Sequence, residues 1–439
     1  MTTLETRPNS ARPQEVLVRE SESPARSSAP KRTGSAGIRV LHLSSWKTRC
    51  GIADYCANFV NALEAAGVES DVFALNRENT RFLTDPEMKA LVGQFLEKAR
   101  DFDVVHIQHE FGLFVGSGRL SNSIRVFRQF LKGLRSMGKP VVVTFHTEPF
   151  AAFREPKVAL HPRTVLGFAS SFFGRNRWGA KISPLFSRRS KRATAIAHSR
   201  YSRLALTKSG FSHERIRVIP HAIIERTNPW LERQAEAKRS LNLPDDAIVL
   251  SMFGFVAKYK GPLFAAKVLR QLPPNYHLLV IGGPHPEDNT DTTFNKILQQ
   301  AGDASLRDRL RVTGYADKAT IDLCQGATDI CLVPYLRSTL LSASGAIAWA
   351  LTSGRPVMAS KIPAFVEISQ TADCLALVTP EAPFEWVWAI QRLAANHAEK
   401  ERLVANAKKY ATNLSWKNVT DQIVAEYRQM LGKTAPATR

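Results

Sequence analysis

Two hydrophobic runs end in the same pair of polar residue types, a histidine and a glutamate. The run 103–108 leads into His109 and Glu110, and the run 141–145 leads into His146 and Glu148. Each run has the composition of a buried strand, and polar residues directly after such strands often face a cleft. A single histidine is more often structural, but its repetition at equivalent strand ends favours a shared functional site.

Two lysines stand in a loop that is bracketed by glycines. The hydrophobic run 247–253 ends in Gly254, and Lys258 and Lys260 follow just before Gly261 and a predicted helix. A lysine at this position could hold a diphosphate as a mobile point charge.

Small residues open a predicted helix at a further strand end. The run 329–333 leads to Ser342, Ser344 and Gly345, and a helix-forming stretch follows at 346–351. Free N–H groups at a helix N-terminus, at the carboxyl end of a parallel strand, suit a phosphate or diphosphate. An ordinary βαβ unit with a tight loop is the alternative interpretation.

Strands and helices alternate around these candidate residues. A strand at 38–43, a helix at 52–66 and a strand at 70–74 predict a βαβ unit of a doubly wound sheet. Gly51, at the start of that helix, could admit a ligand phosphate or sugar, or could simply make a turn. The second half repeats the alternation, so we expect an α/β protein with two Rossmann-like doubly wound domains.

Four segments are predicted along the chain. Residues 1–37 are polar and rich in proline, serine and arginine, so we expect a disordered tail without a signal peptide. The first domain is expected over 38–223 and the second over 224–414, with a linking helix from about Trp230 to Leu241. The segment 415–439 is predicted to form a C-terminal helix, capped at Ser415, and a short tail.

Composition restricts the partners and the compartment. The net charge of +21 indicates an acidic partner or surface, which could be nucleic acid, anionic lipid or a phosphorylated small molecule. The five cysteines are odd in number and lack a zinc-site spacing, so we expect reduced thiols in the cytoplasm. No apolar run approaches the length that spans a bilayer.

The stretch 150–192 concentrates the positive charge and interleaves it with aromatic residues such as Phe186. A solvated basic loop or a nucleic-acid patch are alternatives. We favour an anionic bilayer, with the aromatic side chains dipping into the headgroups, because no recognisable nucleic-acid module accompanies the charge. The residues expected to contact the membrane are Arg175, Arg177, Trp178, Arg188, Arg189, Lys191 and Arg192.

Taken together, the order and spacing of these segments resemble the family 4 glycosyltransferases, which have the GT-B fold. The matching segments are 49–53, 105–112, 144–146, 218–221, 254–261, 314–315, 342–357 and the terminal helix after Ser415. The resemblance implies a bacterial, metal-independent, retaining enzyme with its active site between two domains and a last helix that crosses back. The second domain would bind a nucleotide sugar. The first would bind a lipid-linked or polysaccharide acceptor at the inner face of the plasma membrane.

The resemblance also implies roles for individual residues. His146 would contact the donor sugar and Lys260 would stabilise the leaving diphosphate, so both are candidate catalytic residues. Tyr315 and its neighbours would hold the nucleotide base. The full donor-binding set would be Gly51, Gly254, Lys258, Gly283, His285, Tyr315, Ser342, Ser344 and Gly345, with His109 and Glu110 on the acceptor side of the cleft.

Three positions depart from the family pattern. Phe255 stands where the family commonly has an arginine, and Leu341 and Trp349 align with two glutamates that contact the donor sugar and the ribose. An apolar side chain offers no such hydrogen bond, and each lost charge-assisted contact costs on the order of 1.5–3 kcal/mol. Lys258, in the same loop as Phe255, is a candidate for the missing positive charge.

These departures leave alternatives to the leading hypothesis of a membrane-associated transferase in polysaccharide or glycolipid synthesis. A non-catalytic GT-B partner or scaffold subunit of a synthesis complex would tolerate the substitutions. A GT-B enzyme of another class, such as a sugar-nucleotide epimerase, ranks lower because the basic stretch suits a membrane acceptor. Nucleic-acid binding explains the charge but not the paired βα domains.

Overall fold

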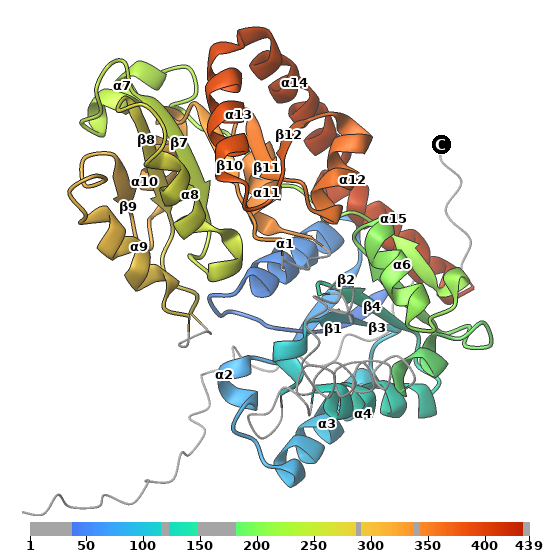
Figure 1. The fold of residues 1–439 in the computed structure, drawn as a ribbon. Coiled ribbons are helices and arrows are strands. Elements are labelled where there is room, and N and C mark those ends of the chain that lie inside the picture. The colour runs from blue at the N-terminus through green and yellow to red at the C-terminus, as the bar shows by residue number, and fades with distance from the viewer. Residues whose placement is uncertain (1–36, 116–122, 148–180, 287–290, 338–342, 433–439) are drawn as a thin grey trace, which may run out of the picture. The chain divides into compact units, whose positions relative to one another are not determined.

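The computed structural model of the protein describes residues 37–115, 123–147, 181–286, 291–337 and 343–432 (Figure 1). Residues 1–36 of the predicted disordered tail lie outside the described residues, as do Ser342, Leu341, Arg175, Arg177 and Trp178.

The first half of the described chain contains a six-stranded parallel sheet in the order β2-β1-β3-β4-β5-β6. Its strands are β1 (Arg39–Ser44), β2 (Glu69–Ala74), β3 (Val104–His109), β4 (Val141–Phe145), β5 (Ala193–Ala197) and β6 (Ile216–Val218). Its helices include α1 (Gly51–Ala65), α2 (Arg77–Thr80), α3 (Asp85–Ala99), α4 (Ser123–Ser136) and α6 (Arg200–Lys208). Because all strands run in parallel, their carboxyl ends share one edge of the sheet.

The central strands of this sheet are buried on both faces. Every residue of β3, β4 and β5 is buried, as expected for a parallel sheet that helices cover on both sides. Helix α3 begins with a capping box, in which the Thr84 hydroxyl accepts from the Glu87 backbone N–H and Glu87 accepts from Thr84. The predicted strands of this half are confirmed, because apolar runs of this composition suit the buried strands of a parallel sheet.

The second half contains another six-stranded parallel sheet, in the order β12-β11-β10-β7-β8-β9. Its strands are β7 (Ile248–Phe253), β8 (Tyr276–Ile281), β9 (Leu310–Val312), β10 (Ile330–Val333), β11 (Val357–Ser360) and β12 (Leu375–Val378). Its helices include α7 (Gln234–Ser240), α8 (Pro262–Leu269), α9 (Thr293–Ala301), α10 (Lys318–Ala327), α11 (Gly345–Leu351), α12 (Pro363–Ala372), α13 (Pro383–Ala395) and α14 (His397–Asn413). The prediction of two Rossmann-like domains is therefore confirmed.

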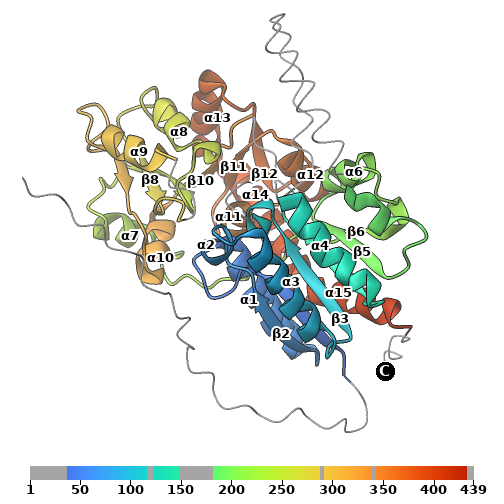
Figure 2. The ribbon, with the colours of Figure 1, turned by 90° about the horizontal axis from the view of Figure 1, so that it is seen from below.

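The last helix, α15 (Trp416–Met430), returns to the first half of the chain, as predicted (Figure 2). Its apolar residues Val419 and Ile423 share a hydrophobic core with the first sheet and with α1. Polar contacts fix the register: the Tyr427 hydroxyl bonds the His106 ring, and the Thr194 hydroxyl donates to Glu426 at 2.7 Å.

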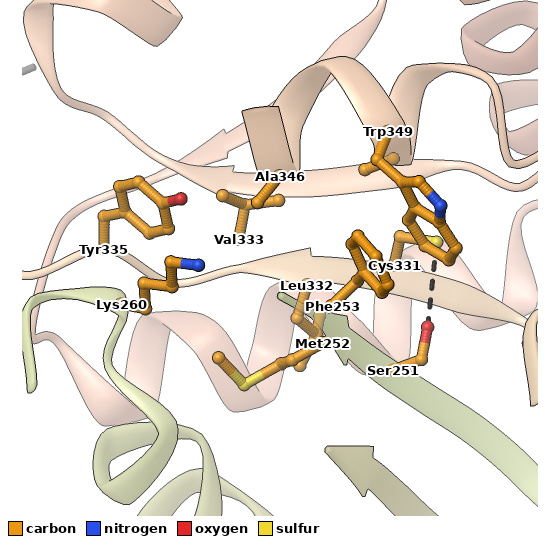
Figure 3. Close-up of a pocket in the computed structure, with 11 residues that line it drawn as sticks. Ser251, Met252, Phe253, Lys260, Cys331, Leu332, Val333, Tyr335, Ala346 and Trp349 are labelled. Atoms are coloured by element: carbon orange, nitrogen blue, oxygen red, sulfur yellow. Dashed lines mark hydrogen bonds between the residues drawn. The ribbon is translucent and has the colours of Figure 1, made fainter. Parts of the chain in front are cut away.

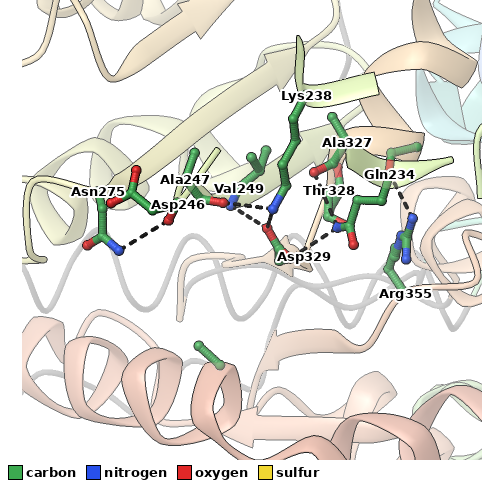
Figure 4. Close-up of polar contacts among 12 residues, drawn as sticks. Gln234, Lys238, Asp246, Ala247, Val249, Asn275, Ala327, Thr328, Asp329 and Arg355 are labelled. Atoms are coloured by element: carbon green, nitrogen blue, oxygen red, sulfur yellow. Dashed lines mark hydrogen bonds and ion pairs between the residues drawn. The ribbon is translucent and has the colours of Figure 1, made fainter. Parts of the chain in front are cut away.

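Helix α7 joins the two halves and is tied to the second sheet by Asp329 (Figure 4). The Asp329 carboxylate accepts from Lys238 Nζ at 2.8 Å, from the Val249 backbone N–H at 2.8 Å and from Gln234 Nε2 at 3.0 Å. The helix begins at Gln234 rather than at the predicted Trp230. The Asn228 side chain accepts from the Trp230 backbone N–H at 2.9 Å, which favours a turn there.

A pair of glycine substitutions tests this packing. Gly326, near the end of α10, faces Trp230 so closely that an added Cβ would overlap the Trp230 side chain. We expect Gly326→Ala to lower the free energy of unfolding by about 1–3 kcal/mol, because the backbone must shift. Gly93 lies inside α3 with open space around it, so Gly93→Ala should raise stability by about 0.5–1 kcal/mol. Urea denaturation of both variants measures the two effects, and equal shifts would contradict the packing.

Candidate active site

The carboxyl ends of strands from both sheets line one cleft of about 1330 Å³. This cleft brings together most of the predicted site residues that the structure describes. Those that line it are Gly51, Glu110, His146, Gly254, Lys258, Lys260, Gly283, His285, Tyr315, Ser344 and Gly345.

His109 is the exception, and the prediction that it faces the cleft is wrong. Its side chain is buried among the rings of Phe111, Phe114, Phe127 and Phe145, with centroid distances of 4.4–5.4 Å. Side chains alternate along a strand. Gln108 reaches His146 on one face of the sheet, so the next residue along β3 points into the core on the other face.

The loop that carries Lys260 depends on its two glycines. Gly254 has φ +100°, and a Cβ there would lie 2.8 Å from the Lys260 amine. Gly261 has φ +74°, and a Cβ there would overlap the Pro334 carbonyl. Both positions therefore need a residue without a side chain, which lets the loop fold tightly over the end of β7.

The Lys260 amine is held among aromatic rings. It lies 5.9 Å from the Phe255 ring centroid and 6.0 Å from that of Tyr259, and Figure 3 shows it beside Tyr335. Burial lowers its pKa to about 8. None of the carboxylates in the described residues forms an ion pair with it. The site therefore holds a largely desolvated cation whose charge an anionic ligand could balance.

The start of α11 is fixed by its N-cap. The Ser344 hydroxyl accepts from the Ile347 backbone N–H at 3.4 Å and hydrogen-bonds the Tyr335 hydroxyl at 2.7 Å. Open space surrounds the Cα of Gly345, where an added Cβ would meet no atom within 4 Å. This end of the helix therefore borders free volume in the cleft.

Tyr315 lines the cleft from the second half of the chain. Its ring packs over Gly283, where a Cβ would lie 2.6 Å from it, and its hydroxyl donates to the Pro284 carbonyl at 2.7 Å. The Arg49 guanidinium lies 4.5 Å from the Tyr315 ring centroid. Sequence reasoning included Arg49 in the family-like segment 49–53 but assigned it no role in the site.

Trp349, one of the positions that depart from the family pattern, builds an aromatic floor of the cleft together with Phe253. The Trp349 ring stacks on Phe253 at 3.9 Å with 14° between their planes, and it is buried. The Arg226 guanidinium lies 5.9 Å from the Trp349 ring centroid. Lys258 binds Asp291 through its backbone N–H at 2.8 Å, and its side chain is exposed. Trp349 thus supplies packing where a glutamate would supply a hydrogen-bond acceptor.

Sequence reasoning missed a group of rings at the ends of β4, β5 and β6. Tyr55 of α1 lies 4.8 Å from His146, 5.9 Å from His198 and 4.9 Å from His221, measured between ring centroids. Burial lowers the pKa of all three histidines, so the imidazoles are neutral at pH 7. The rule that found His146 also applies to His198 and His221, because they follow β5 and β6.

The basic residues at 188–192 lie on an exposed turn before β5. Arg188 pairs with Glu214 at 3.3 Å, and Arg192 donates to the Gly138 carbonyl. The expectation that Phe186 dips into a membrane is wrong, because its ring is fully buried and stacks on Phe211 at 4.7 Å. None of the helices in the described ranges is long and apolar enough to cross a bilayer.

Two family descriptions match the chain. Residues 50–225 match the family described as Glycosyltransferase Family 4, and residues 247–396 match Glycosyl transferases group 1. The two matches fall on the two sheets in turn. Together they cover most of the residues that line the cleft.

Curated relatives match part of the chain. A D-inositol 3-phosphate glycosyltransferase of a Nocardioides species is 28% identical over 209 residues, which are 45% of this chain and 44% of the relative. The corresponding protein of Corynebacterium urealyticum is 26% identical over 232 residues, covering 51% and 53%. The chain thus spans about half the length of the curated relatives it matches.

Solved structures share the fold at low sequence identity. HepE of Anabaena, crystallised with UDP, superimposes with a TM-score of 0.66 and 16% identity over 89% of this chain and 100% of that one. Sucrose-phosphate synthase of Thermosynechococcus elongatus gives 0.65 and 20% identity over 90% and 99%. These similarities establish the two-sheet architecture of the chain.

Proposed function

This chain belongs to the family 4 glycosyltransferases and has the GT-B fold, and on that premise we propose that it transfers a sugar from a nucleotide-sugar donor to a membrane-associated acceptor. The product would be a polysaccharide or a glycolipid. Retention of configuration, transfer without a bound metal and a position at the inner face of the plasma membrane are parts of this proposal, and they rest on the family.

The observation that carries the proposal is the desolvated Lys260 amine in the cleft. A leaving nucleoside diphosphate needs positive charge near its β-phosphate, where negative charge develops, so a pre-positioned cation lowers the barrier. The loop around Lys260 brings the amine to the end of β7, while Ser344 and Gly345 open α11 across the same cleft. Lys260 would stabilise the leaving group, and backbone N–H groups near Gly345 would assist it.

His146 fits the role of a sugar contact. Its Nε2 lies 2.8 Å from Gln108 Oε1. Because an amide oxygen only accepts, Nε2 carries the proton and Nδ1 is a hydrogen-bond acceptor of a neutral ring. A neutral imidazole at the cleft wall would orient a donor hydroxyl without opposing the positive charge of Lys260.

Donor binding is tested by calorimetry and thermal unfolding with a panel of nucleotide sugars. UDP-glucose comes first, because the structural neighbour HepE was crystallised with UDP-glucose. A donor present at 100 times its Kd should add about 2.7 kcal/mol to the free energy of unfolding. Absence of a shift with every donor, at concentrations that saturate related enzymes, would oppose the proposal.

The membrane part of the proposal is tested by flotation with anionic liposomes. Each basic residue near such a surface contributes about 1 kcal/mol, so replacing Arg188, Arg189 and Lys191 by glutamine should weaken partitioning by about 100-fold. The matched control replaces Arg239, Lys408 and Lys409, which are equally charged and exposed but lie in the second half. Equal flotation of the two triple variants would show that the 188–192 turn does not contact the membrane.

A non-catalytic partner subunit is the second candidate, and the aromatic floor favours it. Phe255 and Trp349 fill positions where the family carries charged side chains, and Trp349 is buried against Phe253. Such a protein could bind a nucleotide and yet transfer no sugar. Turnover separates the two candidates, because only the transferase releases nucleotide from its donor.

A further inference from the structure

Two ring side chains at the cleft wall have no role in the proposed transfer. Tyr55 comes from α1, and His221 follows β6; both line the cleft. Their ring centroids are 4.9 Å apart, and Trp416, the first residue of α15, packs on Tyr55 at 4.9 Å. The C-terminal helix therefore helps to hold this part of the wall in place.

The tautomer of His221 follows from its backbone contact. His221 Nδ1 lies 2.7 Å from the Ala222 carbonyl oxygen. A carbonyl oxygen accepts only, so Nδ1 carries the ring proton and Nε2 carries a lone pair. His198, 5.5 Å from His221 between ring centroids, has the same arrangement, with its Nδ1 3.0 Å from the Ile219 carbonyl.

These rings leave hydrogen-bonding capacity unused in the described part of the chain. No described residue donates to His221 Nε2 or accepts from the Tyr55 hydroxyl. Deeper in the wall, His198 is only 6% exposed, and its Nε2 is buried without a partner among the described residues. The wall thus combines a hydroxyl donor on Tyr55 with an acceptor on His221, next to a further unsatisfied acceptor.

The chemistry of these groups selects a class of ligand. A phosphate or carboxylate at neutral pH offers mainly lone pairs. The unprotonated Nε2 of a neutral imidazole also presents a lone pair and does not bind them. A sugar or polyol hydroxyl can donate to that nitrogen and accept from a phenol at the same time.

We propose that His221 Nε2 accepts a hydrogen bond from a hydroxyl group of a sugar or polyol, and that the Tyr55 hydroxyl donates to the same ligand. This pair rejects an anionic group at that position. The inference rests on the proposed function and adds the chemistry of the bound group to it. The hydroxyl belongs either to the donor sugar or to the acceptor, and the experiment below separates the two sources.

The test compares His221→Phe, which removes the acceptor nitrogen and keeps a ring, with His221→Gln, which restores an acceptor oxygen. Kinetics are measured with the parent substrates and with singly deoxygenated donors and acceptors. For the wild type, one deoxy analogue should lose about 10- to 100-fold in kcat/KM. For His221→Phe, that analogue and its parent should be used equally well, and His221→Gln should recover part of the discrimination.

If the affected analogue is a deoxygenated donor, the hydroxyl belongs to the donor sugar. If it is a deoxygenated acceptor, the hydroxyl belongs to the acceptor. Tyr55→Phe serves as a second variant that changes a single oxygen atom, so the test holds even if His221→Phe folds poorly. If His221→Phe discriminates among the analogues as the wild type does, the inference is overturned.

Binding of the free nucleotide separates this outcome from a failure of the proposed function. UDP and the other nucleoside diphosphates lack the sugar, so they should bind the wild type and His221→Phe equally. Lack of binding to both proteins would overturn the proposed function and this inference together.

Discussion

Replacing Lys260 by methionine is expected to lower kcat by about 10²- to 10³-fold, which is the usual effect of removing one pre-positioned group that stabilises transition-state charge. The leaving diphosphate would lose the cation that the loop between Gly254 and Gly261 holds in place. Donor-induced thermal stabilisation should also fall. Steady-state kinetics and thermal unfolding with the cognate donor measure the two effects.

The same substitution should stabilise the ligand-free protein. Burial lowers the Lys260 pKa from 10.5 to about 8, so between these values the unfolded chain binds more protons than the folded one. Stability should therefore rise with pH across this window. Below pH 8 the folded protein bears the full free-energy cost of burying the charged Lys260 amine. Lys260→Met removes it, and we expect a gain of about 1–3 kcal/mol at pH 7.

Lys267→Met is the matched control, because Lys267 is exposed on α8. It should change neither kcat nor the pH dependence of unfolding. An active Lys260→Met enzyme, or one that is less stable than the wild type at pH 7, would contradict the role of Lys260 as a desolvated cation that awaits an anion.

Acidification below about pH 6.5 is expected to destabilise the protein steeply. Burial lowers the pKa of His42, His109 and His198 to about 3, and it lowers those of His106 and His146 as well. The unfolded chain takes up protons near pH 6.5 while the folded chain does not. Stability is therefore lost as the pH falls from 6.5 towards 3.

The expected magnitude is large relative to the stability of a domain. At pH 5, each histidine whose pKa is about 3 contributes about 2 kcal/mol of destabilisation, and a domain has only about 5–15 kcal/mol in total. Urea denaturation between pH 5 and 8 measures the loss. His109→Phe should flatten the pH dependence, because the ring sits among phenylalanines, whereas the exposed His213→Gln should not. Identical profiles for both variants would contradict this explanation.

The fold was predictable because its local signals agree with its tertiary structure. The strand predicted at 141–145 is β4, and the glycines at 254 and 261 mark a loop whose conformation requires them. The direction of a side chain was harder to predict, because a shift of one residue reverses the face of a strand. His109 was misplaced for this reason. Phe186 lies in a 3₁₀ helix and not in a strand, and it was misplaced because sequence spacing alone does not show which neighbours fill the core.

Other site residues depend on contacts between distant parts of the chain. Tyr55 reaches His221 only because α1 and β6 meet at the same edge, and the stack of Trp349 on Phe253 joins α11 to β7. No local pattern specifies such pairs. His221 follows a strand end and the same rule would have found it, but its partners and its tautomer required the structure.

Nucleotide release is the most direct test of transfer. Purified protein is incubated with each donor of the panel and with native membranes as the source of acceptor, beside Lys260→Met. We predict that one donor releases its nucleoside diphosphate in a membrane-dependent reaction, and that Lys260→Met is at least about 100-fold slower. Binding of a nucleotide without release from any donor would contradict a transferase and favour the non-catalytic partner subunit.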